Sequence, residues 1–489
     1  MNYRGQRVTI MGLGHFGGGV AAARWLAAQG ALVTISDAAD ENALADSLPL
    51  LADVPIAAMH LGGHRADDCE RAELVVVNPA VRPDSPWLYV ARQSGARLCT
   101  ELELFIENCP AKIIGVTGSN GKSTTAAMIA SILKQTLPSP FGRGAGGEGG
   151  RAYLGGNIGG SLLDELPTMT PRDWAVLEIS SFQLWHFAPR TPHAPREASA
   201  HGVCRIHGTV VTGCSPNHLD WHGSFPEYVA AKQRIFSGQT ADDFAVLNTF
   251  DAEVASWLPL IRGRAVPLPP LDTLPPLSVP GEHNRINAAC AAAAAAAIGC
   301  DDADIRRGLE MFRGLPQRLE QMATIDDRRF YNDSTATTPE STIAALRSLA
   351  GARGTEEVVA KTCSIPETCH RQIPPSPCAA SVWLMAGGKS KGFDFRPLAA
   401  EIVRHACGAA FFGSARNELL ELVAAVNARF PCVSVETMQE ALDWCWRRSR
   451  PGEAIALSPA CASTDQFRNF RERGQQFAQL VDNLPHRSS

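Results

Sequence analysis

Hydrophobic positions in the first hundred residues alternate between short apolar runs and a longer helical pattern. β-Branched runs at residues 8–11, 32–36 and 74–77 alternate with helical stretches such as 19–29. A strand followed by a helix and a further strand is the unit of parallel sheets whose faces are covered by helices. We therefore predict that residues 1–100 form a Rossmann-like α/β domain.

The same alternation continues in two further blocks. The second block opens with a strand at 112–116, a glycine loop and a helix from 122 to about 134. Later strands and helices are predicted at 174–177, 209–212, 284–298, 305–312, 330–331, 339–349, 382–385, 397–406, 409–412, 454–457 and 466 to about 483. We predict an α/β fold of three domains, with a central P-loop ATPase-type parallel-sheet domain at 101–314 and a carboxyl-terminal Rossmann-like domain at 315–489.

Three stretches break the pattern by their composition. Residues near 138–151 are rich in Gly and Pro, those near 189–208 are crowded with Pro, His and Arg, and those near 354–377 are polar with four prolines. Such segments bury too little apolar surface to pack, so we predict exposed insertions. Four possible metal ligands lie in or beside the last stretch: Cys363, Cys369, His370 and Cys378. Their spacing matches no usual zinc pattern, which leaves a metal clip only as an alternative.

Composition excludes several classes of partner. Of the 489 residues, 45% are hydrophobic and 19% are charged, which is enough apolar side chain for sizeable cores. The formal net charge of −5 provides no basic surface of the kind that nucleic-acid binding needs. The longest apolar run, 288–298, is too short to span the ~30 Å hydrocarbon layer of a membrane. We expect neither nucleic-acid binding nor membrane insertion.

The amino terminus and the cysteines bear on the cellular compartment. Residues 1–7 lead directly into the first predicted strand, without the charged, apolar and cleavage regions of a secretory signal. The fourteen cysteines are scattered and form no C-x-x-C pair, unlike the dense disulfide framework of a small secreted domain. We expect a cytoplasmic protein whose cysteines are mostly small buried side chains.

A glycine-rich turn follows the first strand. Residues 12–17 read G-L-G-H-F-G, and Asp37 ends the next strand. Glycines permit a tight turn whose N–H groups can meet a diphosphate at a helix amino terminus, while the acid can accept a hydrogen bond from a ligand hydroxyl or imide. Taken alone, this fingerprint indicates a dinucleotide site, and a purely structural turn is the alternative.

A second glycine loop carries a stronger signal. Residues 115–124 read G-V-T-G-S-N-G-K-S-T, between a predicted strand and a predicted helix. In a P-loop the N–H groups surround phosphates, a lysine such as Lys122 neutralises their charge and a hydroxyl such as that of Ser123 can bind Mg²⁺. The segment departs from the strict pattern because Val116 occupies the first glycine position.

Two possible metal ligands follow apolar strands in the same block. Glu178 comes directly after 174–177, and His218 follows 209–212 in S-P-N-H-L-D-W-H-G. Both therefore belong to the carboxyl ends of strands, where open α/β sheets place ligands. Lys232 lies on a predicted helix, and its periodicity alone indicates an ordinary surface lysine.

Taken together, the motifs resemble those of the Mur ligases. They occur in order over nearly the whole chain, outside the insertions: G-S-N-G-K-S-T (118–124), G-G-N-I-G (155–159), E-I-S-S-F-Q-L (178–184), N-H-L-D-W-H (217–222), Y-V-A-A-K (228–232), G-E-H-N-R-I-N (281–287), G-L-P-Q-R (314–318), N-D-S-T-A-T (332–337) and S-P-A-C-A-S-T-D-Q-F-R-N-F-R-E-R-G (458–474). The S-S-F-Q-L segment and the last block resemble the branch that adds D-glutamate. The D-N-P-R motif expected of the branch that adds a diamino acid does not occur in the chain.

The resemblance implies an ATP-dependent amide ligase of peptidoglycan precursor synthesis. ATP would phosphorylate the terminal carboxylate of UDP-MurNAc-L-Ala, and the amine of D-Glu would attack the acyl phosphate. A carboxylate has a poor leaving group until it is phosphorylated, and positioning with charge neutralisation can supply most of the catalysis. The implied enzyme is cytoplasmic and monomeric, and it uses ATP and two Mg²⁺ ions.

The resemblance also assigns residues to four groups. Catalysis is implied for Lys122, Glu178, His218 and Lys232, and metal binding for Ser123, Glu178, His218 and a carbamylated Lys232. ATP contacts are implied for Gly118, Ser119, Asn120, Gly121, Lys122, Ser123, Thr124, Asn284, Asn287, Arg318 and Asp333. Contacts with the UDP substrate are implied for Gly14, His15, Phe16, Asp37, Asn78, Asn157, Ser180 and Gln183. The D-glutamate pocket is implied to contain Thr337, Lys391, Ser463 and Phe470.

The sequence leaves the roles of several positions open and allows alternative activities. Thr335 stands where the N-D-S-K-A-T form of the motif has lysine, and His15 and Phe16 differ from the small or aliphatic pair expected there. Without the resemblance, Asn284 would be interpreted as a helix N-cap and Phe470 as a core aromatic. The alternative activities are another ATP-dependent amide ligase such as a folylpolyglutamate synthase, an NAD-dependent oxidoreductase fused to an ATPase, and a non-catalytic binding protein.

Overall fold

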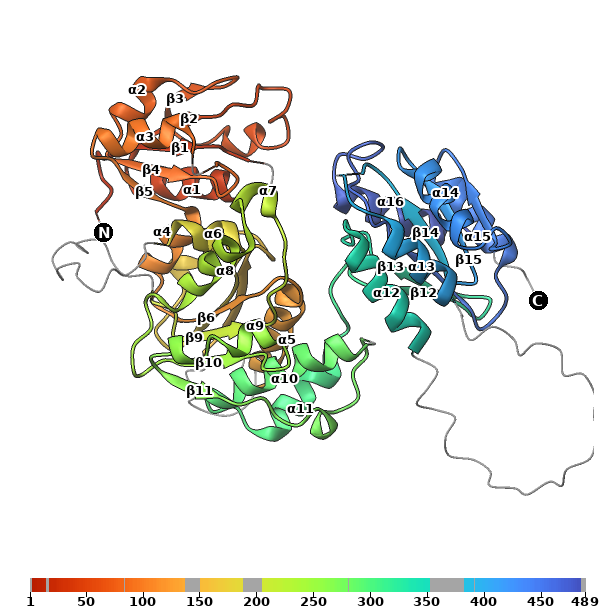
Figure 1. The fold of residues 1–489 in the computed structure, drawn as a ribbon. Helices are drawn as coiled ribbons and strands as arrows, with labels where there is room; N and C mark the ends of the chain where they lie inside the picture. Colours follow the sequence, from red (N-terminus) through yellow and green to blue (C-terminus); the bar gives the residue numbers. More distant parts are fainter. Residues whose placement is uncertain are drawn as a thin grey trace, which may run out of the picture. The chain divides into compact units, whose positions relative to one another are not determined.

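The computed structural model describes residues 2–14, 17–82, 84–136, 150–187, 205–279, 281–351, 382–390 and 392–484. These residues contain three sheets, each formed by a consecutive part of the chain (Figure 1). They divide into two compact units, residues 1–276 with 285–311 and residues 277–284 with 312–489. The first unit contains the first two sheets and the second unit contains the third. The predicted α/β class with parallel sheets is confirmed.

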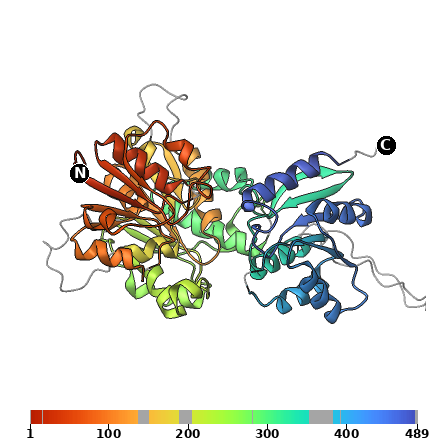
Figure 2. The same ribbon diagram turned by 90° about the horizontal axis from the view of Figure 1, so that it is seen from above.

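The first sheet has the strand order β3-β2-β1-β4-β5, and all of its strands are parallel. Its strands are β1 (Arg7–Met11), β2 (Leu32–Ser36), β3 (Ile56–His60), β4 (Leu74–Val77) and β5 (Arg97–Cys99). Its helices are α1 (Gly18–Ala28), α2 (Ala66–Glu70), α3 (Pro86–Gln93) and α4 (Glu101–Asn108). Alternate strand residues pack toward α1 and α4 on one face and toward α2 and α3 on the other. Figure 2 shows these red and orange strands between their helices.

The second sheet has the order β11-β10-β9-β6-β8-β7 and is also fully parallel. Its strands are β6 (Lys112–Thr117), β7 (Ala152–Gly156), β8 (Trp174–Glu178), β9 (Gly208–Val211), β10 (Phe244–Leu247) and β11 (Arg264–Val266). Its helices are α5 (Lys122–Thr136), α6 (Ser181–His186), α7 (Leu219–His222), α8 (Phe225–Gln233), α9 (Ala252–Ala255), α10 (Glu282–Ala297) and α11 (Asp302–Met311). One hydrophobic core is continuous across the first and second sheets.

The third sheet has the order β12-β13-β17-β14-β15-β16. Its strands are β12 (Glu320–Ile325), β13 (Arg328–Asn332), β14 (Val382–Gly387), β15 (Gly408–Phe412), β16 (Cys432–Ser434) and β17 (Ala454–Leu457). Only the edge strand β12 is antiparallel to its neighbour among the described strands. Its helices are α12 (Pro339–Gly351), α13 (Arg396–His405), α14 (Arg416–Val426), α15 (Met438–Arg448) and α16 (Phe470–Asp482). The core on one face involves α12, α13 and α14, and the core on the other involves α15 and α16.

Three predicted helix starts were wrong. The last helix begins at Phe470 and not at 466, because the Asn469 side chain accepts hydrogen bonds from the N–H groups of Arg471 and Glu472 and so caps the helix there. The helices predicted from 284 and 305 begin earlier, at Glu282 and Asp302. Most of the three predicted insertions lie outside the described residues, as do the four residues of the alternative metal clip, Cys363, Cys369, His370 and Cys378.

Two further expectations concern cysteines and membranes. The ten cysteines of the described segments are all free thiols, and seven of them are buried. Among the helices in these segments, none combines the length and apolar character needed to cross a bilayer.

Candidate active site

The phosphate loop joins β6 to α5 at the carboxyl edge of the second sheet. Gly118 and Gly121 have φ angles of 151° and 82°, a region that side-chain-bearing residues rarely adopt. A Cβ on Gly118 would lie 2.1 Å from Thr212 Oγ1, and a Cβ on Gly121 would lie 2.3 Å from Asn287 Oδ1. Both positions therefore require glycine. The loop leads into the amino end of a 15-residue helix, where N–H groups and the helix dipole favour an anion.

Ser119 holds the phosphate loop from inside the protein. Its N–H donates to Gly213 O at 2.8 Å, and its hydroxyl donates to Ser215 O at 2.8 Å. The same hydroxyl lies 2.9 Å from the Tyr228 hydroxyl. These groups of Ser119, which the family resemblance assigns to ATP, are thus used to shape the loop.

Lys122 is the first residue of α5 and folds back over the loop. Its Nζ donates to Ser119 O at 3.0 Å, so its charge stays beside the loop backbone. The side chains of Ser123 and Thr124 on the next positions are buried. Thr212 Oγ1 donates to Asn120 O at 2.5 Å and so fixes the tip of the loop. The arrangement places a cation, a hydroxyl and a helix amino end where phosphates are bound in P-loops.

Lys232 is buried against the phosphate loop, and its classification as a surface lysine from helical periodicity was wrong. Only 1% of the residue is exposed, because α8 packs on the loop. Its Nζ donates to Gly118 O at 2.7 Å and lies 4.7 Å from the centre of the Tyr228 ring. Burial and the nearby Lys122 charge lower the pKa of Lys232 well below its ordinary value. Burial therefore favours the neutral, nucleophilic form of this amine more than in an exposed lysine.

Glu178 ends β8 beside the phosphate loop. It is the register partner of Val116 on β6, and it is buried with 2% exposed. Among the described residues it accepts one side-chain hydrogen bond, from Asn157 Nδ2 to Oε1 at 3.1 Å, while Asn157 N–H donates to Glu178 O at 2.9 Å. Asn157 is thereby oriented by Glu178. The second carboxylate oxygen of Glu178 and the hydroxyl of Ser123 at the start of α5 are hard oxygen ligands of the kind that Mg²⁺ prefers.

The donor set also indicates how a metal would be held. No group of three or more His, Cys, Asp or Glu side chains able to bind a metal occurs in the described segments. Mg²⁺ usually takes one or two protein ligands and completes its shell with water and substrate phosphates. Glu178 and Ser123 fit that pattern and do not fit a closed metal site formed by protein alone.

His218 is exposed, whereas the two predicted asparagines of α10 are buried. His218 has a left-handed φ of 53°, is exposed, and has its ring 4.8 Å from that of Phe182. Asn287 is buried, and its Oδ1 lies directly against Gly121 of the phosphate loop. Asn284 is also buried, two residues after the start of α10, and therefore is not the N-cap that local sequence favours.

Ser180 and Gln183 form a capping box at the start of α6. Ser180 Oγ accepts from Gln183 N–H at 3.2 Å, and Gln183 Oε1 accepts from Ser180 N–H at 2.9 Å. Their polar atoms are therefore used to begin the helix that follows Glu178. A contact of either side chain with a UDP substrate stays a prediction.

The glycine turn of the first sheet is fixed by the two polar residues predicted beside it. Asp37 accepts from Leu13 N–H at 2.7 Å and from Ala39 N–H at 2.8 Å. Asn78 Nδ2 donates to Gly12 O at 3.3 Å and would lie 2.5 Å from a Cβ on Gly14. The turn, β1 and β4 meet where the strand order reverses, which is where open α/β sheets bind ligands. His15 and Phe16 lie outside the described residues.

Asp333 is a buried acid directly after β13. Its Oδ1 accepts from Leu319 N–H at 3.0 Å and its Oδ2 accepts from Ser458 Oγ at 2.8 Å. Burial raises its pKa to about 6, against the opposing effects of these hydrogen bonds and of the nearby Arg318 charge. Thr335, at the position where lysine was expected, donates its N–H to Gln317 O at 3.1 Å. Arg318 and Asp333, assigned to ATP by the family resemblance, are thus neighbours.

The predicted amino-acid pocket draws on loops at the carboxyl edge of the third sheet. Ser463 is buried in the loop 458–469, which we call the Ser463 loop, and its carbonyl accepts from Gln466 N–H and Phe467 N–H. Thr337 and Phe470 are half-buried, and Phe470 belongs to no core cluster of the described residues, so it is not the core aromatic that composition suggests. Lys391 lies outside the described residues.

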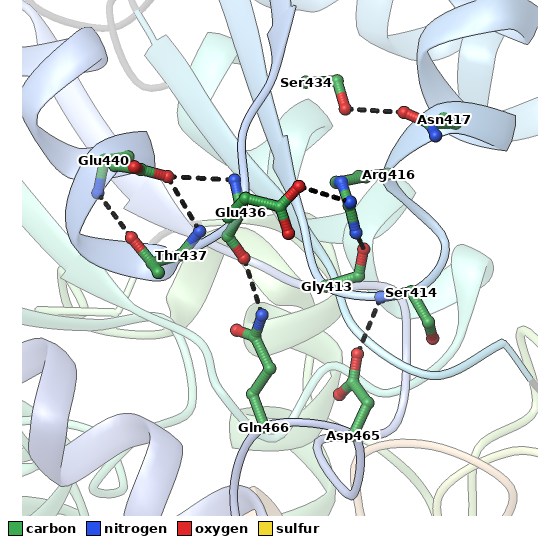
Figure 3. Close-up of polar contacts among 10 residues, drawn as sticks. All are labelled: Gly413, Ser414, Arg416, Asn417, Ser434, Glu436, Thr437, Glu440, Asp465 and Gln466. Carbon is green, nitrogen blue, oxygen red and sulfur yellow. Dashed lines mark hydrogen bonds and ion pairs between the residues drawn. The ribbon is translucent and has the colours of Figure 1, made fainter.

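The Ser463 loop is tied to two neighbouring turns, as Figure 3 shows. Asp465 Oδ2 accepts from Ser414 N–H at 2.8 Å, which ties the loop to the turn after β15. Gln466 Nε2 donates to Glu436 O at 2.6 Å, which ties it to the turn before α15. Ala462 and Lys389 exchange backbone hydrogen bonds of 2.8 and 3.1 Å, which join the loop to the end of β14.

Residue-by-residue reasoning missed several polar side chains that shape these loops. Thr212 and Tyr228 support the phosphate loop, and Ser458 and Arg473 support the loops of the third sheet. Thr212 and Ser458 directly follow β9 and β17, so the rule that selected Glu178 could have found them. Nothing in the local pattern distinguishes Tyr228 or Arg473 from other helical residues.

Comparison with known proteins identifies the class to which this fold and site belong. Residues 6–100 match the Mur ligase MurD-like amino-terminal domain, and residues 116–266 match the Mur ligase middle domain. Together with full-length relatives of more than 30% identity, these matches show that the chain belongs to the Mur ligase family.

Curated relatives extend the likeness over the full chain. A protein of Roseiflexus sp. (strain RS-1) named UDP-N-acetylmuramoylalanine–D-glutamate ligase is 32% identical over 99% of this chain and all of its own length. Its namesake from Symbiobacterium thermophilum is 32% identical over 98% of each chain. Among solved structures, UDP-N-acetylmuramate-alanine ligase MurC of Thermotoga maritima has a TM-score of 0.57 at 18% identity, covering 97% of this chain and 99% of its own. That last likeness concerns the fold alone.

Proposed function

We propose that this protein joins D-glutamate to UDP-N-acetylmuramoyl-L-alanine with ATP, in the cytoplasmic synthesis of the peptidoglycan precursor. The observation that carries the proposal is a phosphate loop with Lys122, Glu178 and the buried Lys232 around it. It occurs in a chain whose full-length relatives are named for D-glutamate addition. ATP first phosphorylates the substrate carboxylate and leaves as ADP. The D-glutamate amine then attacks the acyl carbon, loses a proton and displaces phosphate.

The residues of the second sheet would handle the phosphates in this reaction. Lys122 and the amino end of α5 attract and orient the ATP phosphates, which neutralises charge that would otherwise oppose attack by a carboxylate. Glu178 and Ser123 would hold a Mg²⁺ ion, which supplies further neutralisation of phosphate charge when bound. His218 is proposed as an additional ligand on the exposed side of this group.

Lys232 would serve the site as a carbamate. A lysine carbamate forms when a neutral amine takes up carbon dioxide, and the burial of Lys232 favours the neutral amine that this reaction needs. The reaction forms an N–C bond, releases one proton and converts the amine into an anion, which would add an oxygen ligand for a second Mg²⁺. Mass spectrometry of the intact protein in bicarbonate buffer would detect it, and the Lys232→Arg variant serves as the control.

The first and third sheets would bind the two substrates that are joined. The glycine turn with Asp37 and Asn78 would take the UDP part, at the reversal of strand order. Thr337, Ser463 and Phe470, together with Lys391, would take D-glutamate, whose two carboxylates suit hydroxyl groups and a cation. NAD is not implied, because the turn serves a uridine diphosphate in this proposal.

The deciding experiment measures phosphate release as a function of the amino acid. Purified protein with ATP and Mg²⁺ should release phosphate continuously only when UDP-MurNAc-L-Ala and D-Glu are both present. Full activity with L-lysine or diaminopimelate in place of D-Glu would contradict the proposal. Inhibition by UDP separates this ligase from an amide ligase such as a folylpolyglutamate synthase, which has no use for a UDP site.

A further inference from the structure

Arg473 is a fully buried arginine that has no carboxylate partner at hydrogen-bond distance. It lies in the first turn of α16, and 0% of the residue is exposed. Its guanidinium donates to Ser334 Oγ at 3.0 Å, to Ser334 O at 2.8 Å and to Cys461 O at 3.1 Å. All three acceptors are uncharged, and Arg473 forms no ion pair within the described segments. Burying a cation without a charged partner costs folding free energy. An arginine at this position therefore indicates that its hydrogen bonds have a specific role.

The hydrogen bonds of Arg473 join two loops of the predicted amino-acid site. Nε and Nη2 hold Ser334, which lies three residues before Thr337, whereas Nη1 holds Cys461, which lies two residues before Ser463. A third loop passes over the same group, because a Cβ on Gly388 would lie 3.2 Å from Nη1. The planar fork of one guanidinium thus spans three loops that follow β13, β14 and β17.

Hydrogen bonds also join the start of α16 to the loop that follows β13. Ser334 Oγ donates to Phe470 O at 2.7 Å, and Asn332 Nδ2 donates to Gly474 O at 2.9 Å. These bonds do not involve Arg473. Removing the guanidinium would therefore loosen mainly the Cys461 side, that is, the start of the Ser463 loop, while the bonds of this loop to Ser414, Glu436 and Lys389 would remain.

We propose that Arg473 is a positioning residue for the amino-acid site, which holds the Ser463 loop at a defined spacing from the Thr337 loop. The inference rests on the proposed function, because it takes Ser463 and Thr337 as contacts of an amino acid with two carboxylates. Arg473 itself is buried and acts only through the loops. Asp333 keeps its own hydrogen bonds from Leu319 N–H and Ser458 Oγ, so the ATP side of the third sheet should be affected less than the Ser463 loop.

Two substitutions of Arg473 distinguish a role in positioning the loops from an effect of its positive charge. In Arg473→Met the KM for D-Glu should rise about tenfold or more, since displacement of a binding group by about an ångström has effects of this size. The KM values for ATP and UDP-MurNAc-L-Ala should stay within about twofold. Arg473→Lys keeps the charge, but a single ammonium cannot span Ser334 and Cys461, so it should behave like Arg473→Met. A normal KM for D-Glu in Arg473→Lys, or an equal rise of all three KM values, would overturn the proposal.

Arg328 is the matched control. It is a buried arginine of the same unit that donates to Ser449 O, Ser449 Oγ and Asp326 O, which are again uncharged acceptors. It lies at the start of β13, at the opposite edge of the sheet. Arg328→Met should lower the unfolding temperature yet leave the KM for D-Glu within about twofold. A tenfold rise in this control would show that any buried arginine has the same effect and would refute the specific role of Arg473.

Hydrogen exchange tests the proposal without any turnover. The Gln466 and Phe467 amides, which donate to Ser463 O, should exchange faster in Arg473→Lys than in the wild type, and unchanged exchange would contradict the proposal.

If Arg473 variants do not fold, Ser334→Ala should produce a smaller rise in the KM for D-Glu, and no rise would count against the proposal. A wild-type protein that released no phosphate with D-Glu would refute the proposed function, whereas the exchange comparison would still show whether Arg473 orders this loop.

Discussion

At the scale of single residues, the environment decides what an ionisable group can do. Lys122 and Lys232 belong to the same site, but one folds over the phosphate loop while the other is buried beneath it with a lowered pKa. Asp333 shows the opposite shift, because burial raises the pKa of an acid and lowers that of a lysine. In both cases burial favours the neutral form.

Replacing Lys122 should remove most of the ATP turnover. In Lys122→Ala the phosphates lose the cation beside the loop, and loss of one such electrostatic contact typically lowers kcat by about a hundredfold or more. Steady-state phosphate release checks this. Lys112→Ala is the matched control, because Lys112 is an exposed lysine at the other end of β6. Near-normal turnover in Lys122→Ala would refute the phosphate-loop assignment.

Because of Asp333, the free energy of unfolding should fall as the pH rises. Its pKa is about 6 in the folded state and 3.8 in the reference state, so the folded state binds more protons between these values. The stability linked to Asp333 is therefore highest below about pH 4 and is lost as the pH rises through about 6. Asp333→Asn should unfold at a higher temperature than the wild type at pH 7.5. The difference should vanish near pH 4, and a difference that is independent of pH would contradict the assignment.

At the scale of elements, close packing of two helices supports the phosphate loop. α5, which begins at Lys122, packs on α11, and Ser131 Oγ donates to Gly308 O at 2.8 Å. A Cβ on Gly308 would lie 2.4 Å from the Cα of Ile132, which is backbone and cannot turn aside. The absence of a side chain at residue 308 therefore sets how closely α11 approaches the phosphate-binding helix.

Gly308→Ala should lower the stability of the first unit by about 1–3 kcal/mol. The added methyl group forces the two helices apart, and overpacking of a close contact has costs of this order. Urea unfolding measures the loss, with Glu310→Ala on the exposed face of α11 as the control. An unchanged or raised midpoint in Gly308→Ala would show that α11 can shift without penalty.

At the scale of the whole molecule, the chain consists of two compact units with separate cores. The residues proposed for UDP and for the ATP phosphates lie in the first unit, and those proposed for D-glutamate lie in the second. Proteins with more than one unit commonly unfold in more than one step. A ligand that binds one folded unit raises the stability of that unit.

Thermal unfolding should accordingly show two transitions, and UDP should raise only one of them. At one hundred times its Kd a ligand adds about 2.7 kcal/mol to the stability of the unit that binds it. Gly308→Ala identifies the transition of the first unit. Thr437→Ala, which removes the cap of α15 seen in Figure 3, identifies that of the second. A rise of the second transition with UDP alone would contradict the proposed division of substrates.

The sequence by itself determined the features that depend on neighbouring residues. Alternation of apolar runs predicted the parallel sheets, and the glycine loop before Lys122 predicted a phosphate site, because turn geometry and strand ends are properties of short segments. The apolar run at 174–177 also placed Glu178 at a strand end, as the structure confirms. Helix starts at Glu282 and Phe470 differed, because capping side chains and packing shift such boundaries by a few residues.

Only the tertiary structure decided burial and hydrogen-bond partners. Lys232 reaches Gly118 across 114 residues of chain, and Arg473 reaches Ser334 across 139, so no local pattern could predict either contact. The same holds for Ser119, whose N–H and hydroxyl donate to the carbonyl groups of Gly213 and Ser215, which are distant in the chain. Such contacts arise when the sheet brings distant loops to one edge. There, exclusion of water determines which side chains are charged and which loops are held in place.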